Sequence, residues 1–197
     1  MLKKFIAAFL AMCSIAFFCS CSDYREVERG YLVTALCFES EGQGIEVRVE
    51  ALVPRAYNSD EPKTQILSAE GENATDAVKN LELTLTKELY FDHCAALMLE
   101  SGISAKQISN IIDYCKENNR LSLGLYVVSA DDIDAVLEIE PASGAVGFDI
   151  MNLMKKLKNK NKKDYNNCLY EVEKSMLEST SQLSLPIIKS VSGRVQV

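Results

Sequence analysis

Residues 33–53 have the hydrophobic pattern of two β-strands joined by a turn. Residues 33–38 form a short apolar run, and residues 40–44 are polar and rich in glycine. In residues 45–53 apolar side chains then occupy every second position, from Ile45 to Ala51. A period of two predicts a half-buried strand, and the polar turn between the two runs predicts a hairpin. Residues 64–70 are expected to add a further strand.

Apolar residues then recur at helical spacing. Asn73 or Thr75 is suited to cap a helix that runs to about Leu89, and Ser104 with Gln107 forms a capping box for a second helix. The remaining pattern predicts, in chain order, a strand at 94–99, the capped helix through about 118, a strand at 123–128, a short helix at 130–137, helices at 148–160 and 167–178, and an extended segment at 185–197.

Strands that alternate with helices predict a single α/β (α+β) domain with a sheet covered by helices. The early hairpin adds antiparallel pairing, so we expect the sheet to be mixed.

The first twenty-one residues have the pattern of a bacterial lipoprotein export signal. Lys3 and Lys4 precede an uncharged, mostly apolar run at 5–18, which is shorter than the ~20 residues that span a membrane. Ser20 then precedes Cys21, which predicts removal of residues 1–20 and lipidation of Cys21 in a mature domain of residues 21–197. An uncleaved anchor and a secreted protein without lipid remain alternatives, and all three place the domain outside the cytoplasm.

Loss of those 20 residues would leave 19 basic and 28 acidic residues, a net charge of −9. This balance argues against nucleic acid as a partner and against adhesion to anionic lipid by charge alone. We therefore expect acyl chains on Cys21 to hold the protein on the membrane. The lysines of residues 155–163 are interpreted as a solvated helix end rather than a contact with phospholipid headgroups.

Seven cysteines do not predict a disulfide framework here. Four of them remain beyond the signal and Cys21, and they are widely spaced without a C-x-x-C pair or a Cys/His cluster, so no metal site is expected. We interpret them as small buried hydrophobes rather than as two disulfides. Free thiols outside the cytoplasm would fit a reducing or anaerobic setting. These four residues are Cys37, Cys94, Cys115 and Cys168.

Nothing in the sequence predicts an enzyme or a cofactor site. His93 is the only histidine, and in a strand its neighbour Cys94 would face the opposite side, so the two would not pair as base and nucleophile. We expect His93 to have a structural role, in which a ring hydrogen bond fixes the junction between a helix end and a strand. Residues 143–147 are expected to be a loop and do not form a dinucleotide-binding fingerprint.

Four stretches of the chain carry a resemblance to a known family. They are Cys21-Ser22-Asp23-Tyr24-Arg25-Glu26-Val27 with Tyr31-Leu32-Val33-Thr34; Leu67-Ser68-Ala69-Glu70-Gly71 with Ala77; Leu89-Tyr90-Phe91-Asp92-His93; and Ile111-Ile112-Asp113-Tyr114 with Arg120 and Leu125-Tyr126-Val127-Val128. In order and spacing they resemble the Ger(x)C spore-germination lipoproteins, the C subunit of nutrient germinant receptors. In the third stretch Tyr90, Phe91 and His93 match the family's structural signature, while Asp92 stands where the family often has glycine.

The resemblance implies a non-enzymatic lipoprotein on the outer face of a membrane, the inner membrane in a spore. Its implied partners are the integral-membrane A- and B-type receptor subunits. Only the family's N-terminal domain is matched, so we expect its C-terminal domains to be absent. The alternative function is a stand-alone envelope lipoprotein that binds a small ligand in a cleft of the domain.

Overall fold

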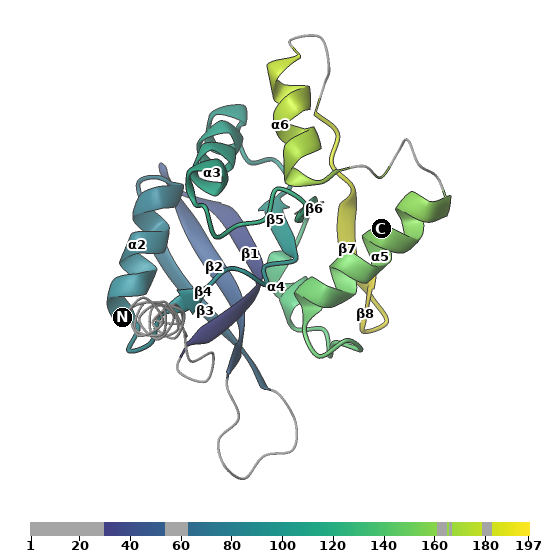
Figure 1. Cartoon of the computed structure of the whole chain (residues 1–197), viewed down its shortest axis with the longest axis horizontal. Helices are drawn as coiled ribbons and strands as arrows, with labels where there is room; N and C mark the ends of the chain where they lie inside the picture. The colour runs from purple at the N-terminus through teal and green to yellow at the C-terminus, as the bar shows by residue number, and fades with distance from the viewer. Residues whose placement is uncertain (1–29, 54–62, 161–164, 166, 179–182) are drawn as a thin grey trace, which may run out of the picture.

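A mixed β-sheet forms the centre of the molecule (Figure 1). The computed structural model describes residues 30–53, 63–160, 165, 167–178 and 183–197. Within these residues, eight strands follow the order β3-β2-β1-β5-β6-β7-β8, with β4 beside the start of β1. The strands are β1 (Tyr31–Glu41), β2 (Gly44–Val53), β3 (Lys63–Gly71), β4 (Leu89–Tyr90), β5 (Ala96–Glu100), β6 (Tyr126–Ala130), β7 (Ile187–Val191) and β8 (Arg194–Gln196). The helices are α2 (Ala74–Thr84), α3 (Ala105–Glu117), α4 (Ile133–Leu137), α5 (Val146–Lys160) and α6 (Leu169–Leu177).

Strand β1 divides the sheet into an antiparallel and a parallel part. On one side β1, β2 and β3 run antiparallel, and the tight β1–β2 turn uses Gly42 at a φ of 55°. On the other side β1, β5, β6 and β7 run parallel, before β8 turns back along β7. The predicted hairpin, the mixed sheet and the α+β class are therefore confirmed.

Helices cover both faces of the sheet and enclose two apolar layers. Leu36 and Phe38 of β1 face the layer that includes residues of α2, α3 and α6. Ala35 and Cys37, which alternate with them, face the layer that includes residues of α4 and α5. A strand that is buried on both faces is expected to be apolar at most successive positions, which explains the run at 33–38, where Thr34 is the single polar residue.

A buried carboxylate joins β2 to the start of α5. Glu50 is 1% exposed, and its two oxygens accept hydrogen bonds from the backbone N–H groups of Val146 (2.7 Å) and Gly147 (2.9 Å). The Thr34 hydroxyl of β1 donates to the same carboxylate at 2.7 Å. The first N–H groups of a helix have no partner within the helix and carry partial positive charge, so a carboxylate is a favourable cap for them.

Gly147 permits this close approach of α5 to β1. A Cβ atom at this position would lie 2.1 Å from the carbonyl oxygen of Thr34. The β1–β2 register shifts between Val33 and Ala35, at the position of Thr34. The Thr34 carbonyl also accepts a hydrogen bond from Ala95 N at 2.9 Å, so this irregularity joins β1 to the segment before β5.

Three details differ from the sequence predictions. The expected loop at 143–147 is wrong at its end, because α5 already begins at Val146, where Glu50 caps it. Alternation assigned Glu50 to the polar face of its strand, but α5 buries that part of the face. The helix expected to run to Leu89 ends at Thr84, because Leu89 belongs to β4.

Among the helices that the structure describes, none is both long and apolar enough to span a membrane.

A side chain at position 147 should make the domain less stable. We expect Gly147→Ala to lower the free energy of unfolding by about 2–3 kcal/mol, because the new methyl group collides with a backbone carbonyl that cannot turn away. Gly124→Ala is the matched control, since a Cβ there meets only the Ser122 hydroxyl at 3.5 Å. Urea unfolding of both variants measures the difference, and equal midpoints would contradict the assigned role of Gly147.

Candidate functional site

The LYFDH segment, Leu89 to His93, lies beside the first residues of β1. Its first two residues form β4, in which Leu89 pairs with Tyr31 and Tyr90 with Leu32. Phe91 follows and is 1% exposed, within the layer beneath α2 and α3. The segment therefore joins the start of the domain to the core.

Arg120 holds this segment from the loop after α3. Its guanidinium donates a hydrogen bond to the carbonyl of Leu89 at 3.1 Å and lies over the Phe91 ring, 5.3 Å from the centroid. It also forms an ion pair with Glu82 of α2 at 3.6 Å. One side chain thus joins α2, β4 and the α3–β6 connection, which explains why the matching arginine accompanies the LYFDH segment in the resemblance.

Tyr90 packs against the residue that enters β1. A Cβ atom at Gly30 would lie 2.3 Å from Cε2 of the Tyr90 ring. The ring therefore occupies the space that any other residue at position 30 would fill, and it fixes the path of the chain into the sheet.

His93 lies in an exposed turn, and the expected ring hydrogen bond is not found. Within the parts of the chain described, no hydrogen bond to the His93 ring is present. Cys94 beside it is buried and its Sγ lies 3.6 Å from the carbonyl oxygen of Ala96. The aromatic ring of Phe91 and the guanidinium of Arg120 fix this junction, and His93 stays at its surface.

The four cysteines of the described domain are free thiols. Cys37, Cys94 and Cys115 are buried, whereas Cys168 at the start of α6 is partly exposed. Burial raises the pKa of Cys94 to about 12 and also raises the pKa values of Cys37 and Cys115. Since only the thiolate is reactive, these three side chains act as small apolar residues.

Two other matched stretches are also packing contacts. Gly71 ends β3 so close to α2 that a Cβ atom would lie 2.2 Å from the backbone nitrogen of Ala77. On α3, Ile111 is fully buried, and Tyr114 meets the Phe38 ring edge-on with 6.4 Å between the centroids. These residues of the second and fourth stretches therefore help to maintain the shape of the domain.

Arg48 is the centre of an ion-pair cluster on the α5 side of the sheet. It contacts Glu39 at 2.6 Å and Glu46 at 3.0 Å, and it also pairs with Asp134 of α4. Burial raises the pKa of Glu39, while the guanidinium of Arg48 acts in the opposite direction. The cluster joins α4 to β1 and β2. In the residues described, His, Cys, Asp and Glu do not gather in a group that would hold a metal ion.

The comparison with family models agrees with the resemblance that the sequence motifs carry. The family model described as the spore germination protein N-terminal domain matches residues 23–190. No curated protein and no solved structure matches the chain. The match spans most of the chain, so the protein belongs to this family of spore germination proteins and contains its N-terminal domain. Cys21, the predicted site of lipidation, lies outside the described residues.

Substitutions at His93 and Arg120 should show that the packed junction contributes more to stability than the exposed turn. We expect His93→Gln to change the free energy of unfolding by no more than about 0.5 kcal/mol, because the ring is exposed. Arg120→Ala should cost about 1–2 kcal/mol, since it removes a charged hydrogen bond and a cation–π contact. Arg194→Ala on exposed β8 is the matched arginine control. Urea unfolding is the measurement, and a larger loss from His93→Gln than from Arg120→Ala would contradict the assignment.

Alkylation should reveal the difference in burial between the cysteines. In the native processed chain at pH 8, we expect iodoacetamide to modify Cys168 and leave the three buried thiols unmodified, because burial raises their pKa values and shields them. In urea all four thiols should react. Mass spectrometry of the labelled peptides gives the count, with Cys168→Ser as the control. Fewer than four reactive thiols in urea would indicate a disulfide and overturn this interpretation.

Proposed function

We propose that the protein is a lipid-anchored, non-enzymatic subunit of a spore nutrient germinant receptor. The observation that carries this proposal is the family match over residues 23–190. The lipoprotein pattern that ends at Cys21 supports attachment to the outer face of a membrane, which would be the inner membrane in a spore.

The proposed anchor lies close in sequence to the strand that starts the sheet. Gly30 enters β1 nine residues after Cys21, and an extended chain of that length reaches about 30 Å at most. Register pairs bring the start of β1 together with β4 and with the β2 and β3 ends at Val53 and Lys63. A diacylglyceryl group at Cys21 would therefore keep this end of the sheet, including the LYFDH segment, nearest to the bilayer.

The proposed mode of action is scaffolding at the membrane. The matched residues Gly71, Phe91 and Ile111 lie in packing contacts, so they hold the domain in one shape. The surface of that shape would then contact the integral-membrane A- and B-type subunits and couple nutrient binding to the germination response. If this is correct, genes for a multi-spanning A-type and a permease-like B-type subunit should lie next to this gene.

Loss of the anchor should abolish function while leaving the folded domain intact. In the spore former that carries the gene, we expect deletion to impair germination with at least one nutrient. Wild type should restore it, and Cys21→Ala should not, because the chain would lack its acyl group and leave the spore membrane fraction. Cys19→Ala is the matched control, since Cys19 would be removed with the signal.

The readouts are the fall in optical density after nutrient addition and immunoblots of the spore membrane. Full restoration by Cys21→Ala would contradict the anchored-subunit proposal. Normal germination of the deletion strain on every nutrient would favour the stand-alone envelope lipoprotein.

A further inference from the structure

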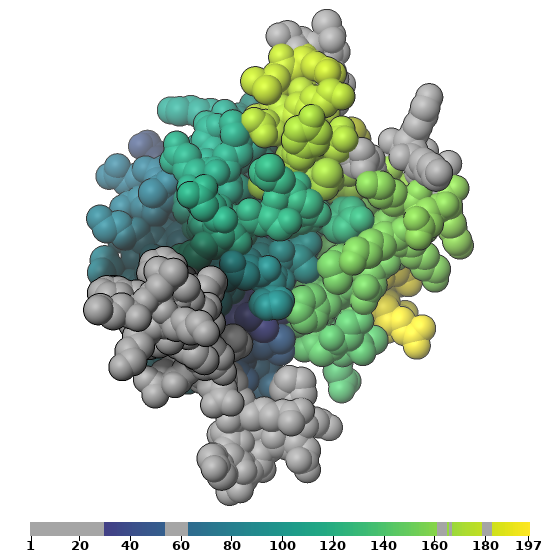
Figure 2. Space-filling model, viewed as in Figure 1, coloured from purple at the N-terminus to yellow at the C-terminus, as the bar shows by residue number. Residues whose placement is uncertain are grey.

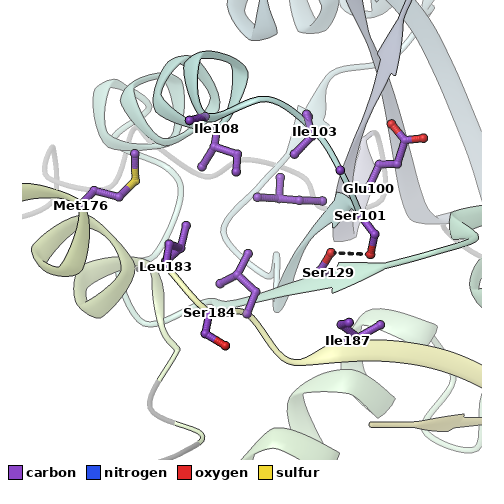
Figure 3. A pocket seen from close by; sticks show the side chains of 13 residues that line it. Glu100, Ser101, Ile103, Ile108, Ser129, Met176, Leu183, Ser184 and Ile187 are labelled. Atoms are coloured by element: carbon purple, nitrogen blue, oxygen red, sulfur yellow. Dashed lines mark hydrogen bonds between the residues drawn. The ribbon is translucent and has the colours of Figure 1, made fainter. Parts of the chain in front are cut away.

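A cavity opens at the end of the sheet that lies opposite the start of β1. It lies between α3, α6 and the segment that enters β7, over the carboxyl ends of β5 and β6 (Figure 3). Its volume is about 650 Å³, within the range of ~300–1,000 Å³ that is usual for small-molecule sites. The carboxyl ends of parallel strands are also where open α/β sheets commonly bind ligands.

Helices α3 and α6 form two walls of this cavity. Figure 2 shows them as neighbouring ridges on one face of the molecule, and Lys116 of α3 pairs with Glu173 of α6 at 2.8 Å. Ile108 and Met176 line the cavity from these helices, and Ile187 of β7 lines it while 42% exposed. The walls therefore present apolar surface to water, which an apolar ligand would cover favourably.

Three serines line the cavity, and two of them, Ser101 and Ser129, form a hydrogen-bonded pair. Ser101 Oγ and Ser129 Oγ are 3.0 Å apart, and Figure 3 shows them facing each other beneath the apolar walls. Their backbone N–H groups are already bonded, to Ala130 O at 2.7 Å and to Pro186 O at 2.9 Å. The two side chains are thus held on fixed backbone.

The serine pair leaves a hydrogen-bond acceptor open to the cavity. Either hydroxyl can be the donor of the bond between them, and a hydroxyl oxygen can accept two hydrogen bonds, so Ser129 Oγ keeps at least one lone pair in both arrangements. That lone pair can accept a hydrogen bond from a donor on a ligand.

The charges around the cavity exclude an anionic ligand. Among the described residues that line it, Glu100 is the only charged one, and its carboxylate accepts a hydrogen bond from Ser40 N at 2.8 Å. Figure 3 shows this carboxylate pointing away from the cavity. Since the lining residues that the structure describes include no lysine, arginine or histidine, a carboxylate or phosphate would lose its hydration there without gaining a cation.

We propose that this cavity binds a small uncharged amphipathic molecule, whose hydroxyl or amide N–H donates to Ser129 and whose apolar body packs between α3 and α6. This binding does not depend on the receptor proposal. A germination subunit and a stand-alone lipoprotein could each use it.

Three probes with one apolar body and different head groups test this chemistry. They are fluorophenylbutanol, fluorophenylbutanoate and butylfluorobenzene, which carry an alcohol, a carboxylate and no polar head. Binding to the processed full-length chain in phosphatidylcholine nanodiscs is followed by fluorine NMR line broadening, with empty nanodiscs as the blank. We expect saturable binding of the alcohol, weaker binding of the hydrocarbon and no binding of the carboxylate.

Two variants test the site itself. Ile108→Trp fills the cavity and should abolish binding of the alcohol, while Ile66→Trp on exposed β3 should not. Ser129→Ala should weaken binding of the alcohol about three- to tenfold, because one neutral hydrogen bond is lost. Binding of the hydrocarbon should not change. Ser68→Ala is its strand control, and circular dichroism verifies that each variant is folded.

Two results would overturn the proposal. One is binding of the carboxylate as tightly as the alcohol, and the other is absence of saturable alcohol binding to the wild-type chain. Unchanged alcohol binding in the folded Ser129→Ala variant would remove the assigned role of Ser129. Because germination is not measured here, these failures are distinct from failure of the receptor proposal.

Discussion

The buried carboxylate of Glu50 is the constraint on which the arrangement of the two helical layers depends. A charge inside a protein is tolerated only when it is fully paired, and the Glu50 carboxylate is paired with three donors from β1 and α5. That requirement fixes where α5 begins and how closely it approaches β1. Gly147 is the residue that makes the approach sterically possible. Removal of either side of this contact would leave polar groups buried without partners.

Local pattern was sufficient to predict most elements of this fold. The hairpin followed from alternation and a glycine-rich turn, and the capping box at Ser104 placed the start of α3, where both of its hydrogen bonds are present. The mixed sheet followed from the order of the elements. These features depend on short stretches of sequence, in which propensity and burial agree.

Long-range contacts explain what the pattern missed. Glu50 lies on the polar side of an alternating strand, 96 residues before Val146 in the chain. Because of this separation, the local pattern gives no sign that Glu50 caps a helix. A glycine one residue into a helix was the available signal for a close backbone contact. Likewise, the sequence placed His93 at a structural junction, but Arg120 makes the contacts there and His93 is exposed. A sequence motif can therefore identify a junction without showing which of its side chains holds it.

The two ends of the sheet have different proposed roles, membrane attachment at one end and ligand binding at the other. If Cys21 is lipidated as proposed, the end with Gly30 and β4 would be the one nearer to the lipid, and the contacts described there are apolar packing and one arginine. The opposite end has the cavity, with its serine pair and exposed apolar walls. An anchored domain with this polarity would present the cavity away from the bilayer, where both solutes and partner proteins can reach it.

Isolation of the chain from spore membranes tests the central claim most directly. A tagged chain would be purified in mild detergent from the inner spore membrane, and its companions identified and quantified by mass spectrometry. The account predicts that A- and B-type receptor subunits co-purify in constant ratio, and that this association is lost with Cys21→Ala. Recovery of the lipidated chain alone, from membranes that contain both subunits, would contradict it.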